Sequence, residues 1–256
     1  MISAGIDIGS ITAKAALIKD NKLLGTYTKL TGYDHLKAGN AVLDTLLAQT
    51  GIARKDINVV VSTGYGRASI DFADKSMTEI LCHGAGAHFL NSEIRGIIDV
   101  GGQDSKAILL DDTGKVANFA MNDKCAAGTG RFLEVMAKAL DVELDKMGEF
   151  DLKSEKPSKI SSICTVFAES EVISMIARQE KREDIIAGIH DSAAARVASL
   201  ARKIKISTPI AMTGGVAKNK GMVNALNRHL NTVLLISDFP QENGAIGAAV
   251  LGSNLV

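Results

Sequence analysis

Two acidic residues, a lysine and a pair of glycines lie within one short stretch of this sequence, Ile98-Asp99-Val100-Gly101-Gly102-Gln103-Asp104-Ser105-Lys106-Ala107. The β-branched apolar run before the glycines predicts a strand that ends in a glycine turn. Glycine lets main-chain N–H groups approach phosphate oxygens, and a nearby carboxylate can hold Mg²⁺ directly or through water. The stretch is therefore typical of a loop that binds phosphate.

An earlier stretch, Ile6-Asp7-Ile8-Gly9-Ser10-Ile11-Thr12-Ala13-Lys14-Ala15-Ala16-Leu17, aligns with it without a gap. The two stretches share an acidic residue, a glycine and a lysine, namely Asp7 and Asp99, Gly9 and Gly101, and Lys14 and Lys106. A repeat at this scale predicts two similar half-molecules.

The composition excludes some classes of function. The chain has 256 residues, of which 46% are hydrophobic and 4% aromatic, and its formal net charge is zero. This length allows two modest lobes or one large domain. Because no basic excess is available to neutralise nucleic-acid phosphates, we expect no nucleic-acid partner.

We expect a cytoplasmic protein without a membrane span. Met1 leads directly into the first expected strand, and no apolar run approaches the roughly 20 residues of a membrane helix. The three cysteines, Cys82, Cys125 and Cys164, are odd in number and far apart, which favours a reducing compartment over a disulfide framework.

The first half of the chain alternates strands and helices. Apolar patterns predict strands at 3–9, 13–19, 23–30 and 57–62, and helices at 35–50 and 77–89. The loop 63–67 follows a strand and is either an ordinary glycine turn or a nucleotide contact. Within the second helix, Cys82 lies among apolar residues and is expected in the core, while His83 and His88 have no second metal ligand at a suitable spacing.

The second half repeats this order with additions. We expect strands at 98–100, 116–121, 210–212 and 233–236, and helices from 132, at 166–179, at 183–204 and from 240. The segment 213–221 places paired glycines after a strand, which suits close approach to a ligand.

Cys125 and Cys164 each precede an expected helix. The positive end of a helix favours a thiolate and would stabilise an anionic cluster. Ordinary thiols, a nucleophile and metal ligands all remain possible interpretations of this pair. Since closed zinc and cubane sites usually take four protein ligands, two thiolates would suffice only if a two-fold dimer supplied two from each chain.

The three glycine turns and the order of elements resemble the actin, sugar-kinase and heat-shock-chaperone ATPase superfamily. This resemblance implies an α/β fold of two ribonuclease-H-like lobes with ATP in the cleft. Residues 6–14 resemble the first phosphate loop, 98–106 the second and 213–221 the adenosine motif. The implied lobes are 1–96 and 97–240, with a C-terminal helix at 241–256 that packs back on the first lobe.

A narrower resemblance rests on the segment 122–130 (Asn-Asp-Lys-Cys-Ala-Ala-Gly-Thr-Gly), on 99–104 and on Cys164. Together they closely resemble the activator components of 2-hydroxyacyl-CoA dehydratases, which are related to the ATPase subunits of benzoyl-CoA reductase. The resemblance implies a homodimer with one 4Fe-4S cluster between the subunits, held by Cys125 and Cys164 of each chain.

The implied activity is ATP-dependent electron donation. Reduced ferredoxin or flavodoxin would supply the electron, and a separate iron–sulfur dehydratase or reductase would accept it. ATP could favour the transfer only by favouring a conformation that differs in cluster environment or partner fit.

The same resemblance assigns roles to residues of the loops. Ser10, Thr12 and Lys14 would contact phosphate or Mg²⁺, Asp7 and Asp99 would support the metal, and Gln103 or Asp104 would position the attacking water. The other residues expected near the nucleotide are Gly9, Ile11, Ala13, Gly101, Gly102, Gly128, Gly214, Gly215, Lys218 and Gln241.

Two other functions fit the superfamily. The first is a small-molecule kinase of the acetylglucosamine-kinase type, which would need a substrate pocket and a general-base carboxylate. The second is a non-enzymatic nucleotide switch. Both leave Cys125 and Cys164 unexplained.

Overall fold

The computed structural model of the chain describes residues 1–162 and 164–255 and is mixed α/β with two sheets, as predicted. The chain divides into two compact units. Unit 1 comprises Met1–Arg95, Leu110–Ala117 and Ser237–Val256, of which position 256 lies outside the described residues. Unit 2 comprises Gly96–Leu109 and Asn118–Ile236.

The sheet of unit 1 has the strand order β3-β2-β1-β4-β5. Its strands are β1 (Ile2–Ile8), β2 (Thr12–Lys19), β3 (Lys22–Leu30), β4 (Val59–Thr63) and β5 (Lys75–Ser76). β1 and β2 form the expected antiparallel hairpin, and β4 lies parallel to β1 on its other side. In the turn into β3, Asp20 and Asn21 adopt the left-handed conformation, which these residue types tolerate better than most.

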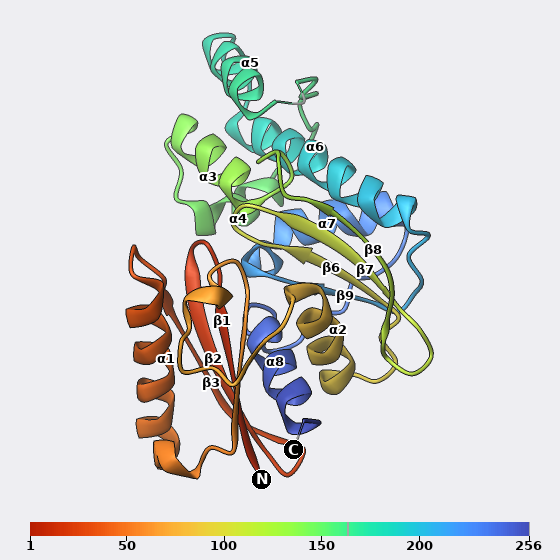
Figure 1. The fold of residues 1–256 in the computed structure, drawn as a ribbon. Coiled ribbons are helices and arrows are strands. Elements are labelled where there is room, and N and C mark those ends of the chain that lie inside the picture. The colour runs from red at the N-terminus through yellow and green to blue at the C-terminus, as the bar shows by residue number, and fades with distance from the viewer. Residues whose placement is uncertain (163, 256) are drawn as a thin grey trace. The chain divides into compact units, whose positions relative to one another are not determined.

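Helices cover both faces of this sheet (Figure 1). α1 (His35–Thr50) packs on one face, and α2 (Glu79–Leu90) and α8 (Asn243–Ser253) pack together on the other. The backbone N–H of Lys37 donates to the Asp34 side chain, which caps the start of α1. Two short 3₁₀ helices lie at Arg54–Asp56 and Arg67–Ser69.

Small residues allow α8 to lie directly on the strands and on α2. A side chain at Gly5 of β1 would overlap the carbonyl oxygen of Ala245, and one at Gly247 would overlap the carbonyl oxygen of Cys82. The Cys82 thiol is fully buried, as expected for a core cysteine, and burial raises its pKa to about 12.

The segment 110–117 clusters with unit 1 because its turn packs against α2. Gly84 of α2 lies close to Leu110 and Val116, and Gly114 lies against the ring of His88. The implied lobe boundary near residue 96 agrees with the start of unit 2, but this segment was not expected in unit 1.

The sheet of unit 2 has the order β8-β7-β6-β9. Its strands are β6 (Gly96–Val100), β7 (Ser105–Leu110), β8 (Val116–Asn122) and β9 (Ile210–Thr213). The pairing repeats that of unit 1, because β7 runs antiparallel to β6 and β9 runs parallel to it.

Among the described residues of unit 2, the α-helices are α3 (Gly130–Ala139), α4 (Met147–Asp151), α5 (Thr165–Ala177), α6 (Arg182–Lys203) and α7 (Lys220–Leu230). Short 3₁₀ helices lie at Leu144–Lys146 and Gly215–Lys218. Buried residues of these helices and of the sheet form one core. In the whole of the chain that the structure describes, no helix has both the length and the apolar character needed to cross a membrane.

The expected strand at 233–236 is wrong. Only a single bridge joins Leu235 to Ala211, and 233–236 does not form a strand of the sheet. The backbone N–H of Leu234 instead donates to the side chain of Asn227, and that of Thr232 donates to the Asn227 carbonyl. Bonds to α7 thus replace a continuous ladder.

Candidate functional site

Unit 1 holds a buried ion pair at the ligand-binding end of its first hairpin. The pairing register of β1 and β2 sets Asp7 opposite Lys14, and the Lys14 Nζ lies 3.0 Å from Asp7 Oδ2. Both residues are buried. Because an unpaired charge in the interior is costly, this pair fixes both side chains beside the glycine turn.

The turn between β1 and β2 is closed by bonds from three directions. The N–H of Gly9 donates to the Thr12 carbonyl at 3.0 Å, and the Thr31 hydroxyl donates to the Gly9 carbonyl at 2.8 Å. Gln241 Nε2 donates to the Thr12 hydroxyl at 3.2 Å. Unit 1 therefore brings together Asp7, Gly9, Ser10, Ile11, Thr12, Ala13, Lys14 and Gln241.

The loop after β4 lies against the same carboxylate. Gly64 has φ of 86°, and a side chain there would overlap Asp7 Oδ1 and the Ile8 carbonyl oxygen. Gly66 N–H donates to that carbonyl at 2.9 Å. The sequence left loop 63–67 open between a plain turn and a nucleotide contact, and the structure places it at the Asp7 end of the site.

Unit 2 repeats the ion pair. Asp99 of β6 faces Lys106 of β7, with Nζ and Oδ2 3.1 Å apart, and Lys106 Nζ also lies 2.7 Å from Asp104 Oδ1. Lys106 is 1% exposed. The Thr213 hydroxyl, at the end of β9, donates to Asp99 Oδ1 at 2.9 Å.

The repeat extends to the neighbouring parallel strand of each unit. Thr63 pairs with Asp7 in the register of β4 with β1, and Thr213 pairs with Asp99 in the register of β9 with β6. A glycine of positive φ follows each threonine, and Gly214, at 87°, lies as close to Asp99 and Val100 as Gly64 does to Asp7 and Ile8. Our sequence reasoning missed this correspondence, although a Thr-Gly pair after an apolar strand was its signal.

The start of α3 is bonded to the second glycine turn. Gly130 N–H donates to the Gly101 carbonyl at 2.9 Å, and Arg131 N–H donates to the Gly102 carbonyl at 2.8 Å. Gly128, with φ of 83°, lies in the turn just before α3. Unit 2 therefore brings together Asp99, Gly101, Gly102, Gln103, Asp104, Gly128, Gly214, Gly215 and Lys218 around β6, the start of α3 and the turn after β9.

The two candidates for positioning water differ in their surroundings. The Asp104 carboxylate is engaged by Lys106, whereas Gln103 is exposed and its side chain makes no hydrogen bond within the described part of the chain. The amide of Gln103 is therefore available to a ligand.

A buried histidine that the sequence did not single out supports the segment after the second Thr-Gly pair. His190 of α6 lies 2.6 Å from Asp151 through Nδ1 and 3.0 Å from Asn219 Nδ2 through Nε2. Asn219 caps α7 by accepting from Met222 N–H at 3.1 Å. With both ring nitrogens engaged, His190 holds the residue that directly follows Lys218.

Cys125 lies in a loop that one side chain closes. Asn122, the last residue of β8, donates through Nδ2 to the carbonyls of Cys125 at 2.7 Å and Ala127 at 3.2 Å, and its Oδ1 accepts from Cys125 N–H at 3.3 Å. The Thr129 hydroxyl donates to the Ala126 carbonyl at 2.6 Å. Cys125 itself is half-buried and separated from α3 by this turn.

Cys164 is exposed and is the residue immediately before α5. Its approach is held by Glu171, whose carboxylate accepts from Ser161 N–H at 3.0 Å and from Ser162 N–H at 2.9 Å. Burial alone would raise the pKa of Glu171, but the hydrogen bonds from Ser161 and Ser162 together hold that pKa below its ordinary value.

The described residues contain no group of three or more side chains able to hold a metal ion. Unit 2 thus offers two thiols, one half-buried and one exposed, to any metal centre. These thiols alone do not make a closed site.

We predict that Lys106→Met destabilises the fold strongly, because it leaves Asp99 and Asp104 without their buried cation. We expect a loss of about 3–5 kcal/mol in the free energy of unfolding measured with urea. The control is Lys115→Met, at a position outside the ion-paired cluster, which should change that free energy by roughly 0.5 kcal/mol or less. Equal losses in the two variants would contradict the role of Lys106.

We predict that the Ser161–Ser162 segment loosens in acid. Since the folded-state pKa of Glu171 is depressed, its stabilising bonds are present above the ordinary carboxyl pKa and are lost as pH falls through the lowered value. Glu171→Gln should mimic this loss at neutral pH, seen as faster hydrogen exchange at Ser161 and Ser162. Unchanged protection in the variant would show that other contacts hold the segment.

Comparison with known proteins identifies the family. The profile of the BadF/BadG/BcrA/BcrD ATPase family matches residues 4–252. The 2-hydroxyisocaproyl-CoA dehydratase activator of Clostridioides difficile is 46% identical over 250 residues, covering 98% of this chain and 94% of the relative. One component of the benzoyl-CoA reductase of Thauera aromatica is 33% identical over 263 residues, covering 98% and 93%.

Solved structures agree with the fold. The Acidaminococcus fermentans (R)-2-hydroxyglutaryl-CoA dehydratase component A superposes with a TM-score of 0.96 at 42% identity, covering 100% of this chain and 98% of that one. A ROK family glucokinase from Streptomyces griseus gives a TM-score of 0.58 at 15% identity, which shows the shared actin-like fold alone. The duplicated phosphate loops and the extent of these matches show that the chain belongs to the BadF/BadG/BcrA/BcrD ATPase family.

Proposed function

We propose that this ATPase donates single electrons to a 2-hydroxyacyl-CoA dehydratase or a related low-potential iron–sulfur enzyme. The observation that carries the proposal is the direct bonding of α3 to the Gly101-Gly102 turn, because the loop that leads into α3 contains Cys125. A nucleotide loop and a candidate redox ligand are thereby joined by a few residues of one segment. Relatives named as dehydratase activators support the same assignment.

We assign ATP and Mg²⁺ to the two ion-paired loops. Ser10, Thr12 and Lys14 contact phosphate or the metal, and the carboxylates of Asp7 and Asp99 support Mg²⁺ through water. The availability of the Gln103 amide favours it over Asp104 as the group that orients the attacking water. Gly214, Gly215 and Lys218 take the adenosine side, where the His190–Asn219 contact holds the following residue in place.

The two thiols fit a cluster shared between two chains. Cys125 and Cys164 lie in the same unit, Cys164 is exposed, and each precedes a helix whose positive end favours an anionic group. When bound, a 4Fe-4S cluster supplies one-electron transfer. We therefore propose a homodimer in which each chain contributes these two cysteines.

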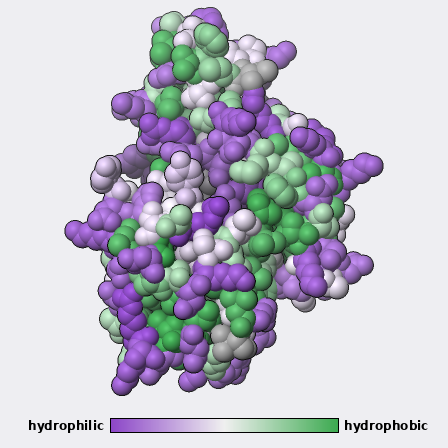
Figure 2. Space-filling view, in the orientation of Figure 1, coloured by the Kyte–Doolittle hydropathy of each residue, from purple (hydrophilic) through white to green (hydrophobic). Residues whose placement is uncertain are grey.

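The surface of α5 supports a protein partner beside Cys164. The sequence predicts an apolar helix there, yet only Ala168, Val172 and Met175 are buried. Its apolar residues at the surface, Val166, Phe167, Ile173 and Ile176, are 65%, 68%, 55% and 42% exposed. Figure 2 shows hydrophobic atoms gathered on this helix, at the top of the view. An apolar surface of this kind is typical of an interface, and we assign it to the second copy of the chain.

The bonds of α3 suggest how nucleotide could affect the cysteine loop. Phosphate binding at Gly101 and Gly102 would change the backbone to which Gly130 and Arg131 are bonded. Displacement of α3 would then pull on the Ala126–Thr129 turn and on Cys125. ATP can drive the reaction only if the two conformations of this segment differ in their affinity for ATP.

We infer the remaining partners from the same chemistry. A reduced ferredoxin or flavodoxin supplies the electron, and a separate iron–sulfur dehydratase or reductase accepts it. The proposed location is the cytoplasm.

We predict that protein purified without oxygen contains roughly two iron atoms and two sulfides per chain, as one cubane per dimer requires. Cys125→Ser and Cys164→Ser should each lose this iron, because each removes one ligand from both chains. Cys82→Ala, at the buried cysteine, should retain it. The measurement is iron and acid-labile sulfide with visible absorption. Parent protein that holds no iron after anaerobic reconstitution would refute the electron-donor assignment.

A further inference from the structure

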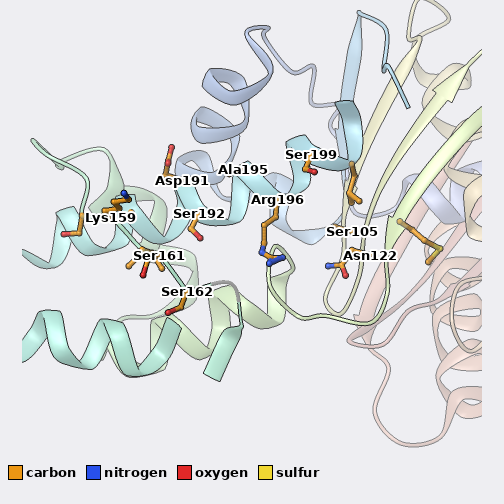
Figure 3. Close-up of a pocket in the computed structure, with 15 residues that line it drawn as sticks. Ser105, Asn122, Lys159, Ser161, Ser162, Asp191, Ser192, Ala195, Arg196 and Ser199 are labelled. Carbon is orange, nitrogen blue, oxygen red and sulfur yellow. The ribbon is translucent and has the colours of Figure 1, made fainter. Parts of the chain in front are cut away.

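Unit 2 contains a cavity of about 700 Å³ that shares no lining residue with the proposed ATP and cysteine sites (Figure 3). One wall is α6, the opposite wall is the segment 158–162, and the ends of β7 and β8 contribute Ser105, Met121 and Asn122. This volume is within the range of small-molecule sites.

The α6 wall presents hydrogen-bond donors in a row. Ser192, Arg196 and Ser199 are spaced by four and three residues, so they share one face of the helix. Figure 3 shows them along α6, with Lys159 and Ser162 on the segment opposite. Within the described part of the chain, no hydrogen bond or ion pair engages the side chains of Ser192, Arg196 or Ser199.

The charges in the lining favour an anion. Lys159 and Arg196 are cationic, and Asp191 is the acidic residue among the lining residues. The Asp191 carboxylate is already engaged, because its Oδ1 lies 2.9 Å from His229 Nε2 and 3.9 Å from Arg228. In the cavity wall, as far as the structure describes the chain, the guanidinium of Arg196 thus remains a cationic group without a protein partner.

The donor geometry suits a phosphate group. A guanidinium donates two parallel N–H bonds to an oxyanion, and the flanking hydroxyls of Ser192 and Ser199 can donate to further oxygens. A phosphate ester offers three terminal oxygens, one more than a carboxylate. It therefore uses more of the donors on this face of α6.

The rest of the cavity is too large and too apolar for a bare ion. Met121, Ile160, Ala195 and Leu200 line it together with the polar residues. Burying apolar ligand surface against these side chains would add affinity. We propose that this cavity is a second small-molecule site, which binds an organic phosphate with an apolar body.

The test uses phenyl phosphate, inorganic phosphate and phenol as probes, titrated calorimetrically into the full chain with a non-hydrolysable ATP analogue at saturation. We expect saturable binding of phenyl phosphate, weaker binding of inorganic phosphate and the weakest binding of phenol. Binding of phenyl phosphate no tighter than that of phenol would overturn the proposal, as would the absence of saturation in the millimolar range.

Variants locate the site. Arg196→Ala should weaken phenyl phosphate binding by about tenfold or more, since it removes a charge-assisted donor. The control Lys203→Ala, at an exposed position of the same helix, should bind as the parent does. The combined variant Ser192→Ala with Ser199→Ala gives a second reading if Arg196→Ala lowers the thermal midpoint. Parent-like affinity in a folded Arg196→Ala protein, or in the folded double-serine variant, would assign the phosphate to another place.

Discussion

A buried lysine held by a carboxylate across the first hairpin is the interaction on which each unit depends. Lys14 with Asp7 and Lys106 with Asp99 occupy equivalent register positions. Each carboxylate also faces the Thr-Gly turn of the neighbouring parallel strand, so one charged pair organises two loops. Because these charges are removed from water, the pair tolerates little displacement, and the glycine turns are held in place before any ligand arrives.

The two units differ in the segment after their third strand. In unit 1 the chain passes from β3 directly to α1, whereas in unit 2 the segment between β8 and α6 contains α3, α4 and α5. Both candidate redox cysteines lie in this added segment. The duplicated part therefore accounts for nucleotide chemistry, and the added part accounts for the features that distinguish this ATPase from a kinase of the same fold.

Much of the fold was predictable because its signals are local. The match of Asp7 and Lys14 to Asp99 and Lys106 lies in contiguous sequence, and apolar periodicity located α1, α2, α3 and α6 close to their observed bounds. The equivalence of Thr63 and Thr213 depends on which strands are parallel neighbours, which local patterns do not encode. The role of His190 depends on Asp151 and Asn219, which only the folded chain brings together.

Two errors of interpretation have a common physical cause. Apolar residues were expected to mark buried elements, yet those at 233–236 form only one bridge, and several on α5 face outward. Hydrophobicity indicates that a surface is unfavourable in water and does not say whether the same chain or another covers it. For α5, the neighbouring Cys164 makes a second chain the more informative interpretation.

The central claim is that ATP controls the release of an electron from the cysteine-bearing segment. The most direct measurement mixes the reduced protein anaerobically with a 2-hydroxyacyl-CoA dehydratase and follows the oxidation of the donor by visible absorption. The account predicts oxidation of the donor with ATP and retention of its electron with ADP. Equal transfer with both nucleotides, or no transfer with either, would contradict it.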